Sequence, residues 1–232
     1  MNAQMTIDSA DPAGKWLYRV GGIAALVLGL GYVIIFPLFA QVGAPPTGGD
    51  AWLAYLPGKT TVWWAILGLS VFTDLLYVPV ALSLYVALRR VDRYLMLLAA
   101  AFVGVFVTLD LAVTWTNYAA LLKLSDLHAA AANDVQRAGY VAAAQYASAV
   151  LASPAEVVCA IVDLSLGILM IGLVMLKGAG IFSRVTAYLG LATGVLGILS
   201  LAGLFVTVIL NAVLATVWLF FVGFRLLRLG RQ

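Results

Sequence analysis

Charged residues are scarce in this chain, and those that interrupt its long apolar stretches are all acidic. Only 10% of the 232 residues are charged, whereas average soluble domains carry roughly 25%. No Lys or Arg lies within the core of any long apolar stretch. Since 64% of the residues are hydrophobic and the mean hydropathy is +1.08, the composition excludes a soluble globular domain and predicts a polytopic membrane protein.

Cysteine and histidine are each present once. The single Cys159 excludes an internal disulfide and a multi-cysteine metal site, and the single His128 excludes a tris-His zinc centre or a bis-His haem within one chain. The sequence also lacks a phosphate-binding loop, a Gly-x-Ser-x-Gly elbow and an intramembrane Lys for a retinal Schiff base. We therefore predict no cofactor, no metal and no catalytic residue. We also expect no nucleic-acid partner, because the net charge of +3 comes from basic residues at helix ends.

Six apolar stretches are long enough to cross a bilayer. The sequence predicts an all-α transmembrane domain over residues 15–232, after a mobile tail at 1–14, with spans at about 16–40, 61–88, 94–122, 155–175, 185–204 and 206–224. Residues 123–153 are polar at first and then Ala-rich, which predicts an outer loop and helix that lies on the bundle or extends the fourth span. Trp52, Tyr55, Trp63 and Trp64 predict an aromatic belt at the interface.

The basic residues decide between six and seven spans, because cytoplasmic loops are enriched in Lys and Arg. With six spans and both termini inside, only Lys59, Lys123 and Arg137 lie outside. The ten inside are Lys15, Arg19, Arg89, Arg90, Arg93, Lys177, Arg184, Arg225, Arg228 and Arg231. A seventh span at 131–152 would leave only the first five of these inside. The sequence therefore predicts six spans in the cytoplasmic (inner) membrane, with both termini cytoplasmic.

Three spans carry a deeply placed aspartate, namely Asp74, Asp110 or Asp163, and Glu156 begins the fourth span. Carboxylates without a basic partner face the bundle interior or a wet cavity. At 1.5 Å per residue, the three aspartates lie roughly 20, 18 and 12 Å below the outer helix ends, so they can share one layer. Helical spacing places further polar residues on the same faces. The predicted outward-opening pocket comprises Asp74, Tyr77, Asp110, Thr114, Asn117, Glu156, Asp163 and Asn211.

Three functions fit these residues. The first is binding, sensing or transport of a proton, a cation or a small amphiphile in the acidic pocket. The second is a non-catalytic structural or accessory role, in which each buried acid only links helices. The third is an intramembrane hydrolase that uses Asp74 or Asp110 with Asp163, although the Gly-x-Gly-Asp setting of such enzymes is absent. The pattern favours a non-enzymatic role. The expected partners are the lipid bilayer and the small ligand, and a homodimer can supply the second half that many transporters encode as a repeat.

Three stretches also carry a resemblance. They are PPTGGDAWLAYLPGKT after the first span, FTDLLYVPVALSLYVALRRVDRYLMLLAA around Asp74, and VDLSLGILMIGLVMLKGAGIFSRVTAYLGLATGVLGIL around Asp163. Together they resemble a bacterial family of six-helix integral membrane proteins catalogued as a domain of unknown function. The resemblance implies a six-helix inner-membrane protein, and it brings no activity and no catalytic residue.

Overall fold

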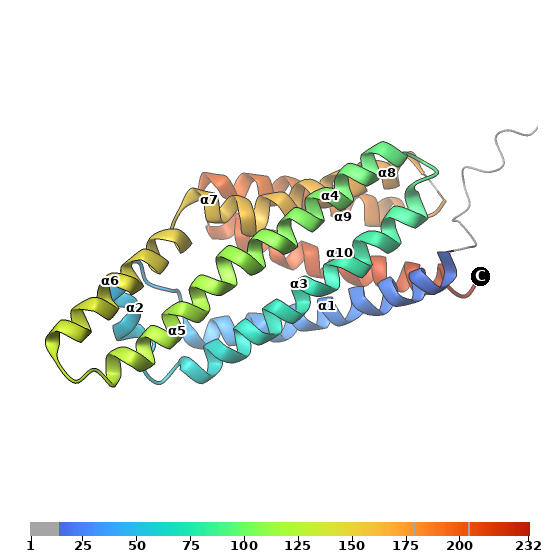
Figure 1. Cartoon of the computed structure of the whole chain (residues 1–232). Coiled ribbons are helices and arrows are strands. Elements are labelled where there is room, and N and C mark those ends of the chain that lie inside the picture. The colour runs from blue at the N-terminus through green and yellow to red at the C-terminus, as the bar shows by residue number, and fades with distance from the viewer. Residues whose placement is uncertain (1–13, 179, 204) are drawn as a thin grey trace, which may run out of the picture.

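In the computed structural model, the chain folds into a bundle of long, roughly parallel or antiparallel helices (Figure 1). The structure describes residues 14–178, 180–203 and 205–232, so the predicted tail falls almost entirely outside the described residues. The described residues form helices and no β-strand, which confirms the all-α prediction.

Within the described residues, six helical spans are long and apolar enough to cross a membrane, which confirms the predicted number. Three spans are composite: a π-helical segment interrupts the α-helix in two of them, and a 3-10 segment ends the third. The spans are α1 (Lys15–Val42), α3 (Thr60–Leu88), α4–η3–α5 (Arg93–Leu109, Asp110–Trp115, Thr116–Ala129), α7–η4–α8 (Pro154–Val157, Val158–Val162, Asp163–Lys177), α9–η5 (Arg184–Leu199, Ser200–Ala202) and α10 (Phe205–Leu229). The chain is therefore a multi-pass membrane protein by the length and composition of its helices.

The six spans pack as a closed ring. Each span contacts its two neighbours in the order α1, α3, α4, α8, α9, α10 and back to α1. The outer faces of the ring carry exposed apolar side chains, such as Leu30, Leu82 and Leu98, as expected for surfaces that contact lipid. The inner faces supply the buried residues of the main core. Polar groups that point inward are consequently held away from both lipid and bulk water.

Small residues bring neighbouring helices together within this ring. A Cβ added to Gly194 of α9 would lie 2.8 Å from the Ser165 carbonyl oxygen of α8, and one on Gly190 would lie 2.9 Å from Nε1 of Trp218 in α10. A Cβ on Gly21 of α1 would collide with the Ser83 side chain of α3. The GxxxG spacing of Gly190 and Gly194 thus serves intramolecular packing.

One end of the bundle is covered by α2 (Gly49–Tyr55) and α6 (Asp134–Leu151), which we call the α2/α6 end (Figure 1). α6 packs against α2 and α5. Its Ser148 hydroxyl and its Gln145 side-chain oxygen accept hydrogen bonds of 2.8 and 2.7 Å from the backbone N–H groups of Gly48 and Gly49. The predicted outer helix therefore lies on the bundle. It does not extend the fourth span, because Ser153 starts that span anew by capping the N–H of Glu156.

The aromatic residues near this end form a buried cluster instead of a belt. Trp52 and Trp63 are only 2% and 0% exposed, and the Tyr118 ring stacks on Trp63 at 5.1 Å. The belt prediction is wrong for these two tryptophans, because Trp52 of α2 packs against Trp63 of α3 and residues of α5 and α6 enclose the pair. Trp64, at 44% exposed, faces outward as a belt residue would.

The opposite end holds the C-terminus and the start of α1, and we call it the terminal end (Figure 1). Lys15 Nζ and Arg19 Nε donate to the backbone oxygens of Gln232 and Gly230, at 2.9 and 2.8 Å. In the turn before α4, Asp92 accepts a hydrogen bond from the Leu95 N–H and pairs with Lys177 Nζ at 2.9 Å. The Leu95 amide and then Lys177 hold the pKa of Asp92 below its usual range.

Candidate functional site

Two of the predicted acids meet inside the ring on a single hydrogen-bond donor. Trp115 Nε1 donates to Oδ2 of Asp74 at 2.6 Å and to Oδ2 of Asp110 at 3.1 Å. Asp74 lies on α3 and Asp110 begins η3, so the indole joins two neighbouring spans. The two aspartates are only 3% and 4% exposed. Their carboxyl groups also lie within hydrogen-bonding range of each other.

The π-helical turn of η3 explains how Trp115 reaches Asp110. In an α-helix of 3.6 residues per turn, a residue five positions later lies about 140° away around the axis. The wider turn over Asp110–Trp115 brings the two side chains onto the same side. Single π-helical turns occur often at functional sites. A second π-helical turn, η4, packs against η3 from the neighbouring span and immediately precedes Asp163.

Glu156 joins the pair through Thr114. The Thr114 hydroxyl donates to Oε1 of Glu156 at 3.3 Å. Thr114 follows Asp110 by four residues in η3, and its hydroxyl interacts electrostatically with the Asp110 carboxyl group. Thr114 is 4% exposed, whereas Glu156 is half-buried at the N-terminal turn of the fourth span. We call Asp74, Asp110, Glu156, Thr114 and Trp115 the acid cluster. It runs inward from the partly exposed Glu156 to the buried Asp74.

The other predicted site residues lie outside the acid cluster. Asp163 is 8% exposed, and in the described part of the chain no hydrogen bond connects it to Asp74, Asp110 or Glu156. Asn117 donates to the Val113 carbonyl of its own helix at 2.7 Å. Asn211 donates to the Thr193 carbonyl at 2.7 Å and so links α10 to α9. The structure thus joins Glu156 to the aspartates of the second and third spans and leaves Asp163 apart.

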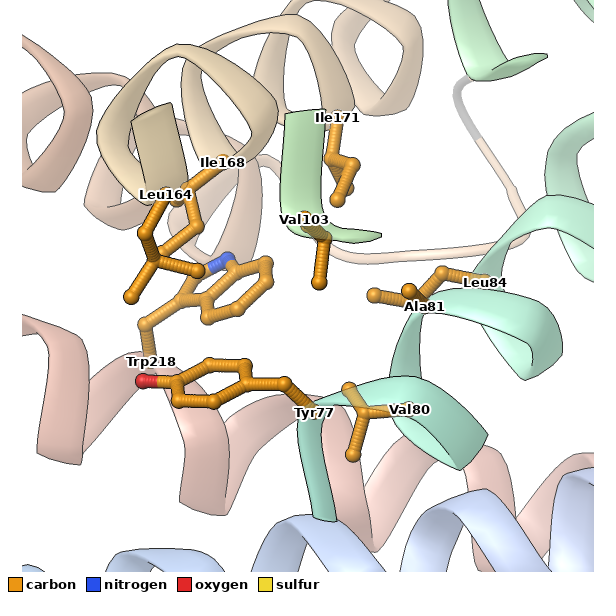
Figure 2. A pocket seen from close by; sticks show the side chains of 9 residues that line it. All are labelled: Tyr77, Val80, Ala81, Leu84, Val103, Leu164, Ile168, Ile171 and Trp218. Atoms are coloured by element: carbon orange, nitrogen blue, oxygen red, sulfur yellow. The ribbon is translucent and has the colours of Figure 1, made fainter. Parts of the chain in front are cut away.

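Tyr77 connects the acid cluster to the centre of the ring. Its hydroxyl lies 2.9 Å from that of Tyr32 on α1. Tyr77 also borders a cavity of about 10 Å³, into which side chains from α3, α4, α8 and α10 point (Figure 2). The remaining lining residues are all apolar or, in Trp218, an indole ring: Val80, Ala81, Leu84, Val103, Leu164, Ile168, Ile171 and Trp218. None of the acids lines this cavity.

The acid cluster is under-supplied with hydrogen-bond donors and positive charge. Asp110 Oδ1 is fully buried and has no hydrogen-bond partner among the described residues. No Lys, Arg or His of the described chain takes part in the interactions of these carboxyl groups. A buried acceptor without a donor costs free energy. The arrangement is consistent with a bound proton or another small positively charged species, which would neutralise the carboxylates.

Metal coordination is not favoured by the positions of these side chains. Within the described residues there is no group of three or more His, Cys, Asp or Glu side chains that could hold a metal ion. The carboxyl pair of the structure is Asp74 with Asp110, whereas the hydrolase hypothesis paired one of them with Asp163. Asp163 is thus not the partner of this pair in the structure, and the third acid connected to it is Glu156, through Thr114.

Sequence reasoning missed Trp115. The face analysis used α-helical spacing, which directs Trp115 away from Asp110, and only the π-helical turn reverses this. One chemical signal was present in the sequence. Apart from threonine hydroxyls, the Trp115 indole N–H is the one side-chain hydrogen-bond donor within five residues of Asp110.

The chain matches no protein family model, no curated protein and no solved structure. The resemblance to a six-helix family of unknown function therefore stays a prediction, and the function has to be argued from the acid cluster itself.

Proposed function

We propose that this protein binds a small positively charged species at the acid cluster, from the outer face of the cytoplasmic membrane, in order to transport or sense it. The observation that carries the proposal is the convergence of Asp74 and Asp110 on one indole donor, with Glu156 linked to them and, among the described residues, no basic side chain in their interactions. Ionisable residues within transmembrane segments are rare, and they commonly mark substrate, ion or proton pathways.

The basic residues support the orientation. Ten of the thirteen Lys and Arg residues lie at or near the terminal end, which the positive-inside rule assigns to the cytoplasm. The α2/α6 end then faces outward, and Glu156 lies on the outer side of the aspartate pair.

Two single-cysteine variants test this orientation, both made in a Cys159→Ser background. Val135 of α6 and Tyr94 of α4 are matched in exposure, at 84% and 83%. We expect a membrane-impermeant maleimide to label Val135→Cys in intact cells, and to label Tyr94→Cys only after lysis. Labelling in the reverse order would contradict the proposed topology.

The binding function is tested by thermal unfolding of the purified protein over a range of pH and with a panel of inorganic and organic cations. A species that binds only the folded state raises the unfolding temperature. We expect such a response to pH or to a cation in the wild type, and its loss in Asp74→Asn and in Asp110→Asn. Asp163→Asn is the matched control, because Asp163 is a buried intramembrane aspartate outside the acid cluster.

The same measurement separates the proposal from a purely structural role. If the acids only link helices, Asp74→Asn and Asp110→Asn will lower the unfolding temperature while every response of the wild type persists. That outcome would refute the binding function and support the structural alternative. A response that Asp163→Asn abolishes and Asp110→Asn preserves would move the site away from the acid cluster.

A further inference from the structure

Resting on the proposed function, we infer that the species bound at the acid cluster is a proton, and that it reaches the cluster from the α2/α6 end only, through Glu156 and Thr114. The inference names the substrate class of the site and adds a closed barrier on its other side. It follows from three features: the space at the carboxyl pair, the link from Glu156, and the lining of the central cavity.

The space at the carboxyl pair favours a proton. Asp74 and Asp110 are at most 4% exposed, and the cavity of the ring centre is bordered by none of the acids. A metal would need further ligands, and no sufficient group of His, Cys, Asp and Glu occurs in the described residues. A proton needs no cavity. Carried by one aspartate, it can be shared with the other carboxyl group and so supply the donor that the buried Oδ1 of Asp110 lacks.

The link from Glu156 provides a path for that proton. Thr114 lies between Glu156 and Asp110, and a hydroxyl can accept one proton while it donates another. In the inward step, protonated Glu156 gives its proton to the Thr114 oxygen as Thr114 gives its own proton to Asp110. One O–H bond breaks and one forms at each transfer, and the net change moves a single proton from Glu156 to Asp110.

The central cavity blocks the path toward the terminal end. Beyond the Tyr32–Tyr77 hydroxyl pair, the space is about 10 Å³ and is surrounded by apolar groups such as Val103 and Ile168 (Figure 2). A water molecule needs about 10–15 Å³ of such volume and two to four polar partners. Among the lining residues only Tyr77 and Trp218 carry polar side-chain groups, and the volume admits one water molecule at most. The cavity therefore cannot hold a chain of water molecules and acts as a plug.

The groups that face the aspartate pair come from several packed elements, and in the part of the chain that the structure describes none of them is basic. They are Tyr32 of α1, Tyr77 of α3, Tyr118 of α5, Glu156 of α7, and Cys159 of η4, which also faces Asp163 of α8. Protonation of the pair is therefore opposed by no neighbouring positive charge. Glu156 is the half-exposed carboxylic acid among these groups, which makes it the point of exchange with water.

The test is proton flux through the full chain reconstituted in liposomes that contain a pH-sensitive dye, driven by a potassium diffusion potential. Wild type is compared with Val103→Thr/Ile168→Ser, which widens the plug and gives it two hydroxyl groups. We expect wild type to conduct no more than empty liposomes. We expect the widened variant to raise the initial rate by about tenfold or more, the factor given by a barrier about 1.4 kcal/mol lower. If the double variant does not fold, Val103→Thr alone is measured, because threonine keeps the shape of valine. We expect it too to raise the initial rate of proton flux.

The acid cluster is tested in the widened background. Asp110→Asn should abolish the leak, because an amide does not pass on a proton, whereas the control Asp163→Asn should preserve it. A leak in the wild type, no leak in folded plug variants, or a leak that survives Asp110→Asn would each overturn the inference. These results are distinguishable from failure of the proposed function. If the change of unfolding temperature with pH or cation still depends on Asp74 and Asp110, the binding site is retained and only the proton path is refuted. If that change does not depend on them, both proposals are refuted.

Discussion

Substituting Gly194 by alanine tests the closest contact between α8 and α9. The added Cβ would lie 2.6 Å from Cβ of Leu169, 2.8 Å from the Ser165 carbonyl oxygen and 2.9 Å from Cα of Leu169. Two of these three atoms belong to backbone, which cannot turn aside as a side-chain end can, so the helices must separate by several tenths of an ångström. Forcing an extra methyl group into a packed core typically costs about 1–3 kcal/mol.

A matched control removes the effect of helix propensity from this number. Gly104 of α4 is also within a span, and a Cβ there would meet nothing within 4 Å. Glycine to alanine within a helix gains about 1 kcal/mol at either position, so this gain cancels in the comparison. We therefore expect Gly194→Ala to be less stable than Gly104→Ala by about 1–3 kcal/mol.

The assay is unfolding by SDS in mixed micelles, followed by tryptophan fluorescence. The difference in unfolding free energy between the two variants is the quantity to compare with the predicted range. Equal stabilities, or a more stable Gly194→Ala, would refute the close approach of α8 and α9 and with it the geometry of the plug that α8 lines.

Three further substitutions give independent tests. Trp115→Phe keeps an aromatic ring but removes the shared indole donor, so we expect a loss of about 1–3 kcal/mol in the same SDS assay, and unchanged stability would argue against the two hydrogen bonds. The lowered pKa of Asp92, caused first by a backbone amide of α4 and then by Lys177, means that its charged form stabilises the fold. Wild type should therefore unfold at a higher temperature than Asp92→Asn above about pH 4. This difference in unfolding temperature should close as the pH falls through the lowered pKa of Asp92. A difference that does not depend on pH would contradict the prediction. Gly49→Ala places a Cβ 2.5 Å from the α6 backbone, so limited proteolysis should cleave residues 123–153 faster than in the control Gly139→Ala, and equal rates would show that α2 does not hold α6 in place.

The sequence was sufficient to predict the six spans because the information is local. Apolar length fixes where a helix can cross the bilayer, and charged residues mark where it stops. The predicted start of the third span at residue 94 and the observed start at Arg93 differ by one residue, as do the starts at 61 and Thr60. The third span is longer than predicted, reaching Ala129, because the polar residues after 122 continue the helix under α6, outside the apolar stretch.

The acid cluster was only partly predictable because it depends on helix irregularity and on packing. Asp74, Asp110, Thr114 and Glu156 were all expected to line one site, from their chemistry and their spacing. Trp115 was not, since 3.6 residues per turn directs it elsewhere. Depth along the helix also predicted that Asp163 would join the aspartates of the second and third spans. Depth does not fix how a helix is rotated about its axis, however, and in the structure it is Glu156 that is connected to the acid cluster, through Thr114.

The closed ring has a consequence for biogenesis. α10 is synthesised after the other five spans, yet its place is between α9 and α1, so the groove on α1 must stay open to lipid until α10 arrives. Gly22 of α1 and Gly223 of α10 form that seam, since a Cβ on either would lie 3.0 Å from the carbonyl oxygen of the other. Ring closure is thus a final, post-insertional step between helices far apart in the chain, and until it occurs the plug lacks the wall that Trp218 of α10 supplies.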